Sequence, residues 1–173
     1  LCWALPLLVS LQAIAEASYD YRVLIAGEDI GYLKVEEDGD VLNVDFDFKQ
    51  NVRGPTVTEK ITLDPRGFPI DWTISGTTTF GSAIDEYFKA DDGVARWRDA
   101  TGPGSKAYTE APGFYINQNG SSYSNALLAQ ALLAKPEGRL KVYPGGEASI
   151  QRSATETLSG QGVEVDIVAY QIL

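Results

Sequence analysis

The chain has 173 residues, and its 24 acidic against 14 basic side chains give a formal net charge of −10 at pH 7. Such an acidic surface repels phosphates and anionic bilayers, so we expect no nucleic-acid partner. The sequence has no His and no Met, and its one Cys is Cys2, so from Ser18 onward it lacks the usual zinc and iron ligands and the usual nucleophile–base pairs.

The first stretch has the features of an export signal. Residues 1–11 are apolar and uncharged, and Ala15-Glu16-Ala17 has the form of a signal-peptidase site. The run is too short to span a membrane, which needs about 20 apolar residues, so we expect no stable membrane insertion. We predict a signal peptide over residues 1–17, truncated at its start, and an exported protein, periplasmic or extracellular. A buried amphipathic N-terminal helix is the alternative.

Residues 18–173 have the size of one ordinary domain, and we predict a single β-rich domain there. Apolar and polar residues alternate strictly over Leu42–Phe48, and Ile70–Ser75 and Val163–Ile167 follow the same rule. Alternation with a period of two puts one set of side chains on a core and the other in water.

Turn signals separate these runs. Glu37–Asp40, Asp64–Gly67 and Asp91–Gly93 each supply residues that start a tight turn or tolerate a positive φ. Strands joined in sequence by tight hairpins are antiparallel neighbours, and Gly76 and Gly81 favour strong curvature. The strands predicted up to Asp99 are Tyr19–Ala26, Gly31–Glu37, Val41–Gln50, Thr56–Leu63, Ile70–Phe80, Ala83–Ala90 and Val94–Asp99.

The pattern changes after this series of strands. Ala100–Gly113 is rich in Gly, Pro and Thr and predicts a loop. Apolar residues spaced by three and four over Ser121–Lys135, followed by Pro136, predict one helix that covers a face of the sheet. Two further strands are predicted, Glu147–Ser159 and Val163–Ile172.

Together these elements predict a mainly β fold. The expected architecture is a strongly curved antiparallel meander sheet, or half-barrel, with one covering α-helix. The last residues of the sequence lie mid-strand, so we expect the domain to be cut at its C-terminal end.

Acidic side chains are the first candidates for chemistry. Asp45 and Asp47 could form a pair for hydrolysis, but they share the face predicted to be in water, which favours a solvated sheet surface. Glu86 differs, because it shares a face with apolar residues of its strand. A buried carboxylate needs a cationic or hydrogen-bonding partner, and we expect Arg96 or Arg98 on the next strand to supply it. We interpret Glu86 first as part of a structural pair and second as a site.

Aromatic residues at strand spacing are the second candidates. Five of them are either plain core or the lining of an apolar pocket: Phe46, Phe48, Trp72, Phe88 and Trp97. A strongly curved sheet with one helix in its mouth is a geometry that leaves such a pocket open.

Two sets of residues resemble known families. Tyr21–Val35, a strand followed by Gly, a short turn, Ile-Gly and a second strand, looks like the first hairpin of exported bacterial half-barrel domains related to the lipoprotein-carrier fold. Asn51–Thr56, Trp72–Gly81 and Asp85–Phe88 together resemble the N-terminal region of certain exported bacterial amidohydrolases. In that family a β-rich segment precedes a metal-dependent barrel. The resemblance covers most of residues 19–172.

The resemblance implies a non-catalytic accessory domain that packs on or near the catalytic barrel of a longer hydrolase. The family's metal site opens with a His-x-His pair, and because this chain has no His, no metal ligand or catalytic residue carries over to it. A divalent metal is implied only for the barrel, which would lie beyond Leu173, and no cofactor is implied for this segment. A pocket or interdomain surface is expected at Arg53, Trp72, Glu86, Phe88 and Trp97.

Two other functions are open alternatives. A free-standing periplasmic carrier or binding protein would hold a lipid or another apolar small molecule inside the half-barrel. An independent enzyme that uses carboxylates alone would have Glu86 as its best candidate.

Overall fold

The computed structural model describes residues 17–160 and 162–173. This part of the chain is mainly β, with an antiparallel sheet of eight strands that curls into a half-barrel and with one helix, so the predicted fold class is confirmed. The signal peptide predicted over residues 1–17 lies outside the described residues, apart from Ala17 at the start of the first strand. No helix of the described part is long and apolar enough to cross a membrane.

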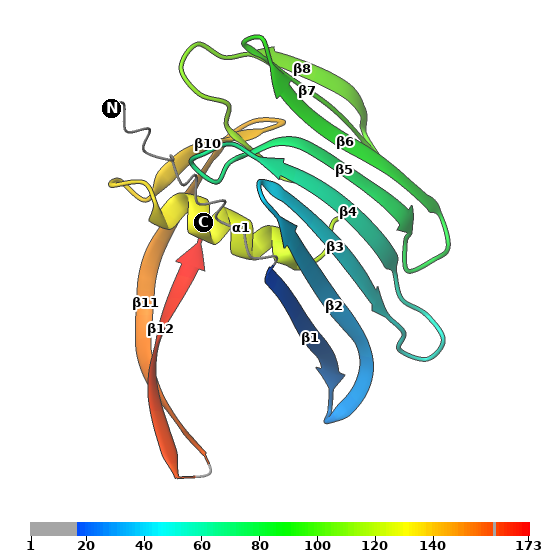
Figure 1. Ribbon diagram of the computed structural model, residues 1–173, viewed down its shortest axis with the longest axis vertical. Helices are drawn as coiled ribbons and strands as arrows, with labels where there is room; N and C mark the ends of the chain where they lie inside the picture. The colour runs from blue at the N-terminus through cyan, green and yellow to red at the C-terminus, as the bar shows by residue number, and fades with distance from the viewer. Residues whose placement is uncertain (1–16, 161) are drawn as a thin grey trace, which may run out of the picture.

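The eight-stranded sheet is a meander in which every strand pairs antiparallel with the next one along the chain. Figure 1 shows that this sheet curls around an open mouth in which the helix α1 (Tyr123–Leu133) lies. The strands of the sheet are β1 (Ala17–Ile25), β2 (Glu28–Asp38), β3 (Val41–Phe48), β4 (Thr56–Leu63), β5 (Pro69–Thr77), β6 (Ala83–Asp91), β7 (Val94–Asp99) and β8 (Gly102–Ala107).

A second sheet of four strands has the order β12-β11-β10-β9. In this sheet β9 and β10 pair in parallel, and the other neighbours are antiparallel. Its strands are β9 (Phe114–Tyr115), β10 (Arg139–Tyr143), β11 (Glu147–Gly160) and β12 (Val163–Ile172). In Figure 1, β11 and β12 form a long hairpin that extends away from α1.

The meander strands β1 to β7 follow the sequence prediction to within three residues at each end, and β4 and β7 match at both ends. The agreement arises because burial follows the alternation of the sequence. On β7, for example, Ala95 and Trp97 are buried, whereas Arg96 and Arg98 are exposed. One face of each central strand therefore meets the interior and the other meets water.

Three strands were not predicted: β8, β9 and β10. The loop predicted over Ala100–Gly113 is wrong in part, because β8 lies within it. Its Gly and Pro residues are weak strand formers, but β8 is an edge strand with a single neighbour in its sheet, where the missing N–H of Pro103 is tolerated. The two-residue strand β9 and the five-residue strand β10 are too short to show a period of their own.

The helix begins and ends two residues inside the predicted range of Ser121–Lys135. Ser122 takes the N-cap position, and the helix ends before Pro136 as expected. The side chains of α1 that are buried share one stripe, as the spacing of three and four residues requires. They are Leu127, Leu128, Ala131 and Leu132.

Aromatic side chains fill the inside of the half-barrel. Five aromatic pairs join the first sheet to the second: Trp72 with Phe114 and Tyr115, Phe88 with Tyr115 and Tyr143, and Trp97 with Tyr143. The rings of Phe88 and Tyr115 stack with their centroids 5.0 Å apart and their planes 8° apart. Offset stacks and edge-to-face contacts of this kind stabilise a core beyond the area that they bury.

The β11–β12 hairpin departs from the pattern of the other strands. Leu158, Val163, Val165 and Ile167 share one face of it with the exposed Glu156, and these four apolar side chains are between 36% and 60% exposed. We call this surface the apolar ribbon face. The prediction that alternation buries one set of side chains is wrong for this hairpin, since no described part of the chain covers the face.

Two neighbouring leucines test how α1 packs. Leu132 is fully buried and Leu133 is 51% exposed. Replacing Leu132 by Ala should lower the free energy of unfolding by about 2–5 kcal/mol, because the change removes buried methyl groups and leaves a cavity. Leu133→Ala, the matched control, should change it by less than about 0.5 kcal/mol. Urea denaturation followed by tryptophan fluorescence measures both, and equal losses would contradict this orientation of the helix.

Candidate functional site

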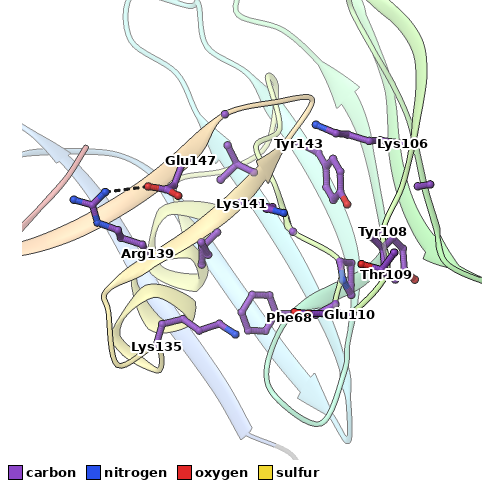
Figure 2. A pocket seen from close by; sticks show the side chains of 17 residues that line it. Phe68, Lys106, Tyr108, Thr109, Glu110, Lys135, Arg139, Lys141, Tyr143 and Glu147 are labelled. Carbon is purple, nitrogen blue, oxygen red and sulfur yellow. Dashed lines mark hydrogen bonds and ion pairs between the residues drawn. The ribbon is translucent and has the colours of Figure 1, made fainter.

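A groove of about 680 Å³ opens between the loop that follows β8 and strand β10 (Figure 2). Lys106 at the end of β8, Lys135 just after α1 and Lys141 on β10 line this groove. Arg139 and Glu147 also line it, and their side chains form an ion pair of 3.1 Å. Sequence reasoning missed the groove, because its cationic residues lie far apart in the chain and meet only where the two sheets pack together.

The interior contains a second polar feature, the buried carboxylate of Glu86 on β6. The Tyr115 hydroxyl and the Gln118 backbone N–H donate hydrogen bonds to its Oε1, each at 2.8 Å. The backbone N–H of Asn119 and its side-chain amide donate to Oε2, at 3.2 and 3.1 Å. All these donors come from β9 and the segment that follows it, so Glu86 holds this part of the chain against the sheet.

The prediction that Arg96 or Arg98 is the partner of Glu86 is wrong. Arg96 forms an ion pair with Asp91 at 2.5 Å, and Arg98 forms one with Asp85 at 2.6 Å. Both arginines are exposed on the outer face of the sheet, whereas Glu86 faces inward. Side chains on opposite faces of a sheet cannot meet, so the interior had to supply another set of donors.

Glu59 on β4 is buried in the same way. Its Oε2 accepts a hydrogen bond from Trp72 Nε1 at 2.8 Å, and its Oε1 accepts one from the Ser121 backbone N–H at 2.6 Å. Sequence reasoning overlooked Glu59, although the signal was present: it shares its strand face with Val57 and Ile61, as Glu86 does with apolar neighbours. A carboxylate on the apolar side of an alternating strand indicates a buried polar anchor.

Glu59 and Glu86 belong to one row across the inner face of the sheet. Both lie opposite Ile74 of the intervening strand β5. Continuing the register of β6 and β7 by one residue places Asp99 level with Glu86. Asp99 Oδ1 accepts hydrogen bonds from the backbone N–H and the hydroxyl of Thr101, while its buried Oδ2 has no partner among the described residues. We call these three carboxylates the acidic row.

The electrostatics of the acidic row follow from its burial. Burial raises the pKa of Glu59, and the charge of Glu86 adds to this, while the hydrogen bonds from Ser121 and Trp72 act in the other direction. Burial also raises the pKa of the Tyr115 hydroxyl, together with its hydrogen bond to Glu86 and the charges of Glu86 and Asp99. Tyr115 therefore keeps its proton and stays a donor to Glu86.

The acidic row is thus a structural anchor. Its carboxylates are closed off from solvent, and those of Glu59 and Glu86 are engaged by backbone and side-chain donors of the chain itself. Carboxylates that hydrolyse a substrate need room for the substrate and water between them. The segment 118–121 occupies that place here.

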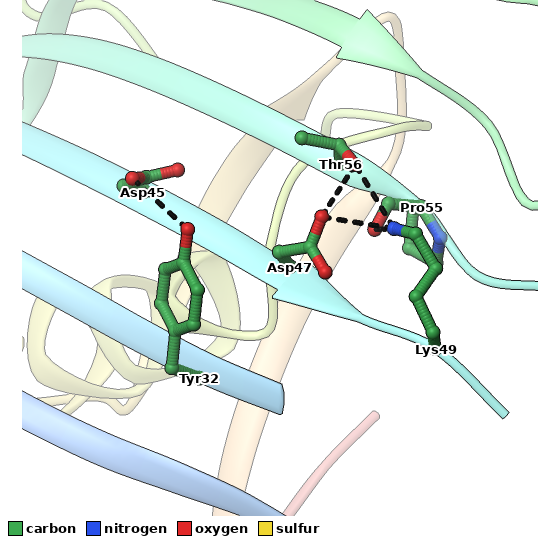
Figure 3. Close-up of polar contacts among 6 residues, drawn as sticks. All are labelled: Tyr32, Asp45, Asp47, Lys49, Pro55 and Thr56. Carbon is green, nitrogen blue, oxygen red and sulfur yellow. Dashed lines mark hydrogen bonds and ion pairs between the residues drawn. The ribbon is translucent and has the colours of Figure 1, made fainter. Parts of the chain in front are cut away.

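Arg53 lies at the exposed turn between β3 and β4 and is not part of the packed interior. The base of this turn is tied by polar contacts (Figure 3). Lys49 Nζ donates to Asp47 at 2.9 Å and to the Pro55 carbonyl at 3.1 Å, and Thr56 Oγ1 donates to Asp47 at 2.5 Å. The Asp47 carboxylate therefore binds Lys49 and Thr56 at the base of this turn.

On the outer face of β3, Asp45 is exposed, as predicted, whereas Asp47 is half-buried. Asp45 is exposed and accepts a long hydrogen bond of 3.4 Å from the Tyr32 hydroxyl. Although partial burial raises the pKa of Asp47, the hydrogen bonds from Thr56 and Lys49 lower it overall. Because Asp45 and Asp47 bind different partners and the pKa of Asp47 is lowered, the two carboxylates do not form an acid–base pair.

Four of the five residues predicted for a pocket or an interdomain surface lie together, and the fifth does not. Trp72, Glu86 and Phe88 lie in the packed interior, and Trp97 is buried beside them. Arg53 is exposed in the turn between β3 and β4. The lining of the groove contains none of these residues.

Within residues 17–160 and 162–173, no group of three or more His, Cys, Asp or Glu side chains is arranged to hold a metal ion. Comparisons of the chain with protein-family models, with curated proteins and with solved structures gave no match. Three features of the described residues bear on function: the acidic row, the groove and the apolar ribbon face.

The anchoring role of Glu86 can be tested against its sequence neighbour. Glu86→Gln places an amide NH₂ among groups that are themselves donors, so it should lower the free energy of unfolding by about 1–3 kcal/mol. Asp85→Asn is the control, because the Asp85 side chain is 78% exposed and forms only a surface ion pair. It should cost less than about 1 kcal/mol. Equal losses in urea denaturation would contradict the anchoring role.

The contributions of Glu59 and Asp64 to the free energy of unfolding should depend on pH in opposite directions. The pKa of Glu59 is raised above its ordinary 4.5, so its stabilising contribution is complete below that pH and is lost as the pH rises through the folded-state pKa. Burial alone would raise the pKa of Asp64, but hydrogen bonds from the Phe68 N–H and from Arg66 lower it overall. Its contribution is complete above its ordinary 3.8 and is lost as the pH falls through the folded-state pKa.

Urea denaturation of wild type, E59Q and D64N at a series of pH values measures this. The stability of wild type relative to E59Q should fall as the pH rises above 4.5, whereas its stability relative to D64N should fall as the pH drops below 3.8. Curves for the three proteins that run parallel throughout would show that neither pKa is shifted.

Proposed function

We propose that residues 18–173 form a non-catalytic accessory domain of an exported hydrolase and that this domain packs against the catalytic barrel of the same polypeptide. The observation that carries the proposal is the apolar ribbon face on β11 and β12, which no described residue covers. We propose that another domain of the same polypeptide covers this face, because its covalent connection gives it a high effective concentration there.

The ribbon has two different faces. On the face opposite the apolar one, Thr157 Oγ1 donates to Asp166 at 2.7 Å, and Ser159 Oγ donates to Glu164 at 3.3 Å. Near the tip of the hairpin this second face is polar and suits water, whereas Val168 and Tyr170, further from the tip on the same face, are 42% and 47% exposed. A two-stranded ribbon is only marginally stable by itself in water, and contiguous exposed apolar side chains commonly mark an interaction surface. The ribbon therefore favours a partner that covers its apolar ribbon face.

A non-catalytic role agrees with the chemistry of the described residues. The most deeply buried carboxylates, Glu59 and Glu86, bind the segment that leads into α1 and leave no space for a substrate. In this proposal the bond-breaking groups belong to the barrel. The sequence resemblance over Asn51–Phe88 is the ground for naming an amidohydrolase barrel, whose own residues would hold a divalent metal.

The alternative of a carrier for a lipid or another apolar ligand is less well supported. Such a carrier needs an open apolar interior. Trp72 and Phe88 are fully buried, and their rings contact Phe114 and Tyr115 instead of lining an empty space. This packing favours the accessory role.

Charges placed on either face of the ribbon test the proposal in the full-length protein. The double variant Val165→Lys/Ile167→Lys puts two charges on the apolar ribbon face, where burial against a partner makes them costly. Thr155→Lys/Ser159→Lys adds the same charge to exposed positions of the same ribbon. Hydrogen exchange over residues 147–172 should speed up at least tenfold in the first variant and stay within about twofold of wild type in the second.

Equal exchange in wild type and in the apolar-face variant would contradict a covered ribbon. The identity of the partner has a separate test, which is the reading frame beyond the codon for Leu173. A barrel that opens with a His-x-His pair is expected there, and a stop codon would overturn the proposal. Turnover of an amide by residues 18–173 alone would contradict the non-catalytic role.

A further inference from the structure

We propose that the groove between the end of β8 and β10 binds a small organic anion that carries two or more carboxylate or phosphate groups. The groove is built by residues other than those of the apolar ribbon face, so this inference does not rest on the function proposed above.

Seven of the 14 basic side chains form ion pairs: Arg22, Lys49, Arg66, Lys89, Arg96, Arg98 and Arg139. The other seven form no ion pair with any described residue. Three of these, Lys106, Lys135 and Lys141, lie together in the lining of the groove, whereas Lys34, Arg53, Lys60 and Arg152 lie outside it. With a net charge of −10 on the chain, three unpaired ammonium groups in one place create a local positive potential that attracts anions.

The three lysines surround the same groove. They come from three different parts of the fold, the end of β8, the segment just after α1 and the middle of β10, and approach the groove from different sides (Figure 2). Lys135 Nζ lies 4.8 Å from the centroid of the Phe68 ring, which positions the ammonium group without neutralising it. Glu110 is the one carboxylate of the lining besides Glu147, which Arg139 already pairs. The unpaired charge of the groove is therefore positive.

The groove is large enough for a small organic molecule. A volume of about 680 Å³ falls within the range of roughly 300–1,000 Å³ that small-molecule sites have, and it is far larger than one phosphate or acetate ion needs. Lysine ammonium groups are mobile point charges that accept carboxylate and phosphate alike. Half-buried Tyr108 and Val142 offer apolar contact to the carbon skeleton of such a molecule. An anion with several acidic groups can reach more than one lysine at once.

Isothermal titration calorimetry of the full-length protein with citrate tests the proposal, and triethyl citrate serves as the uncharged probe. Citrate should bind and triethyl citrate should not. The variant K106Q/K135Q/K141Q should bind citrate at least tenfold more weakly. The matched control K34Q/K60Q/K89Q removes the same charge from exposed positions on the outer face of the first sheet and should bind citrate within about twofold of wild type.

Three results would overturn the proposal: no citrate binding by wild type, equal loss in the two triple variants, or equal binding of triethyl citrate. Inorganic phosphate should bind at least tenfold more weakly than citrate, because a single group cannot reach several lysines. Equal affinity for phosphate and citrate would contradict a ligand with two or more acidic groups. If the groove variant fails to fold, K141Q alone should still weaken citrate binding about threefold, and unchanged binding by it would count against the site.

Discussion

The buried carboxylates of Glu59 and Glu86 hold the two sheets of this domain together. A carboxylate without partners in an apolar interior costs several kcal/mol, so these two side chains bind whatever donors can reach them. The donors are Trp72 within the sheet and, from the second half of the chain, Tyr115 and the backbone N–H groups of segment 118–121. Because α1 follows this segment directly, the same bonds fix where the helix enters the mouth of the half-barrel.

The anchoring of that segment has consequences for both outer surfaces. It places β9 and β10 over the open side of the curled sheet, and their aromatic rings complete the core. The gap left between β8 and β10 becomes the cationic groove. The hairpin of β11 and β12 continues beyond the core, with its apolar face uncovered by any described residue.

A domain with a filled interior acts through its surface. The acidic row supplies stability and not chemistry, which leaves the groove and the apolar ribbon face as the surfaces on which a function can depend. They differ in physical character, since one attracts anions and the other excludes water. The proposed accessory role uses the apolar ribbon face, and the proposed anion site uses the groove, so one can hold without the other.

The sequence by itself determined the meander, the turns, the helix and the burial of Glu86, because period-two alternation and turn residues act between neighbours in the chain. Only the tertiary structure decided what covers each face. It supplied Tyr115 and Asn119 in place of an arginine for Glu86, gathered three distant lysines into a groove, and left Val165 and its neighbours uncovered. The physical reason is that periodicity tells which side chains share a face, whereas the partner of that face comes from residues far away in the chain.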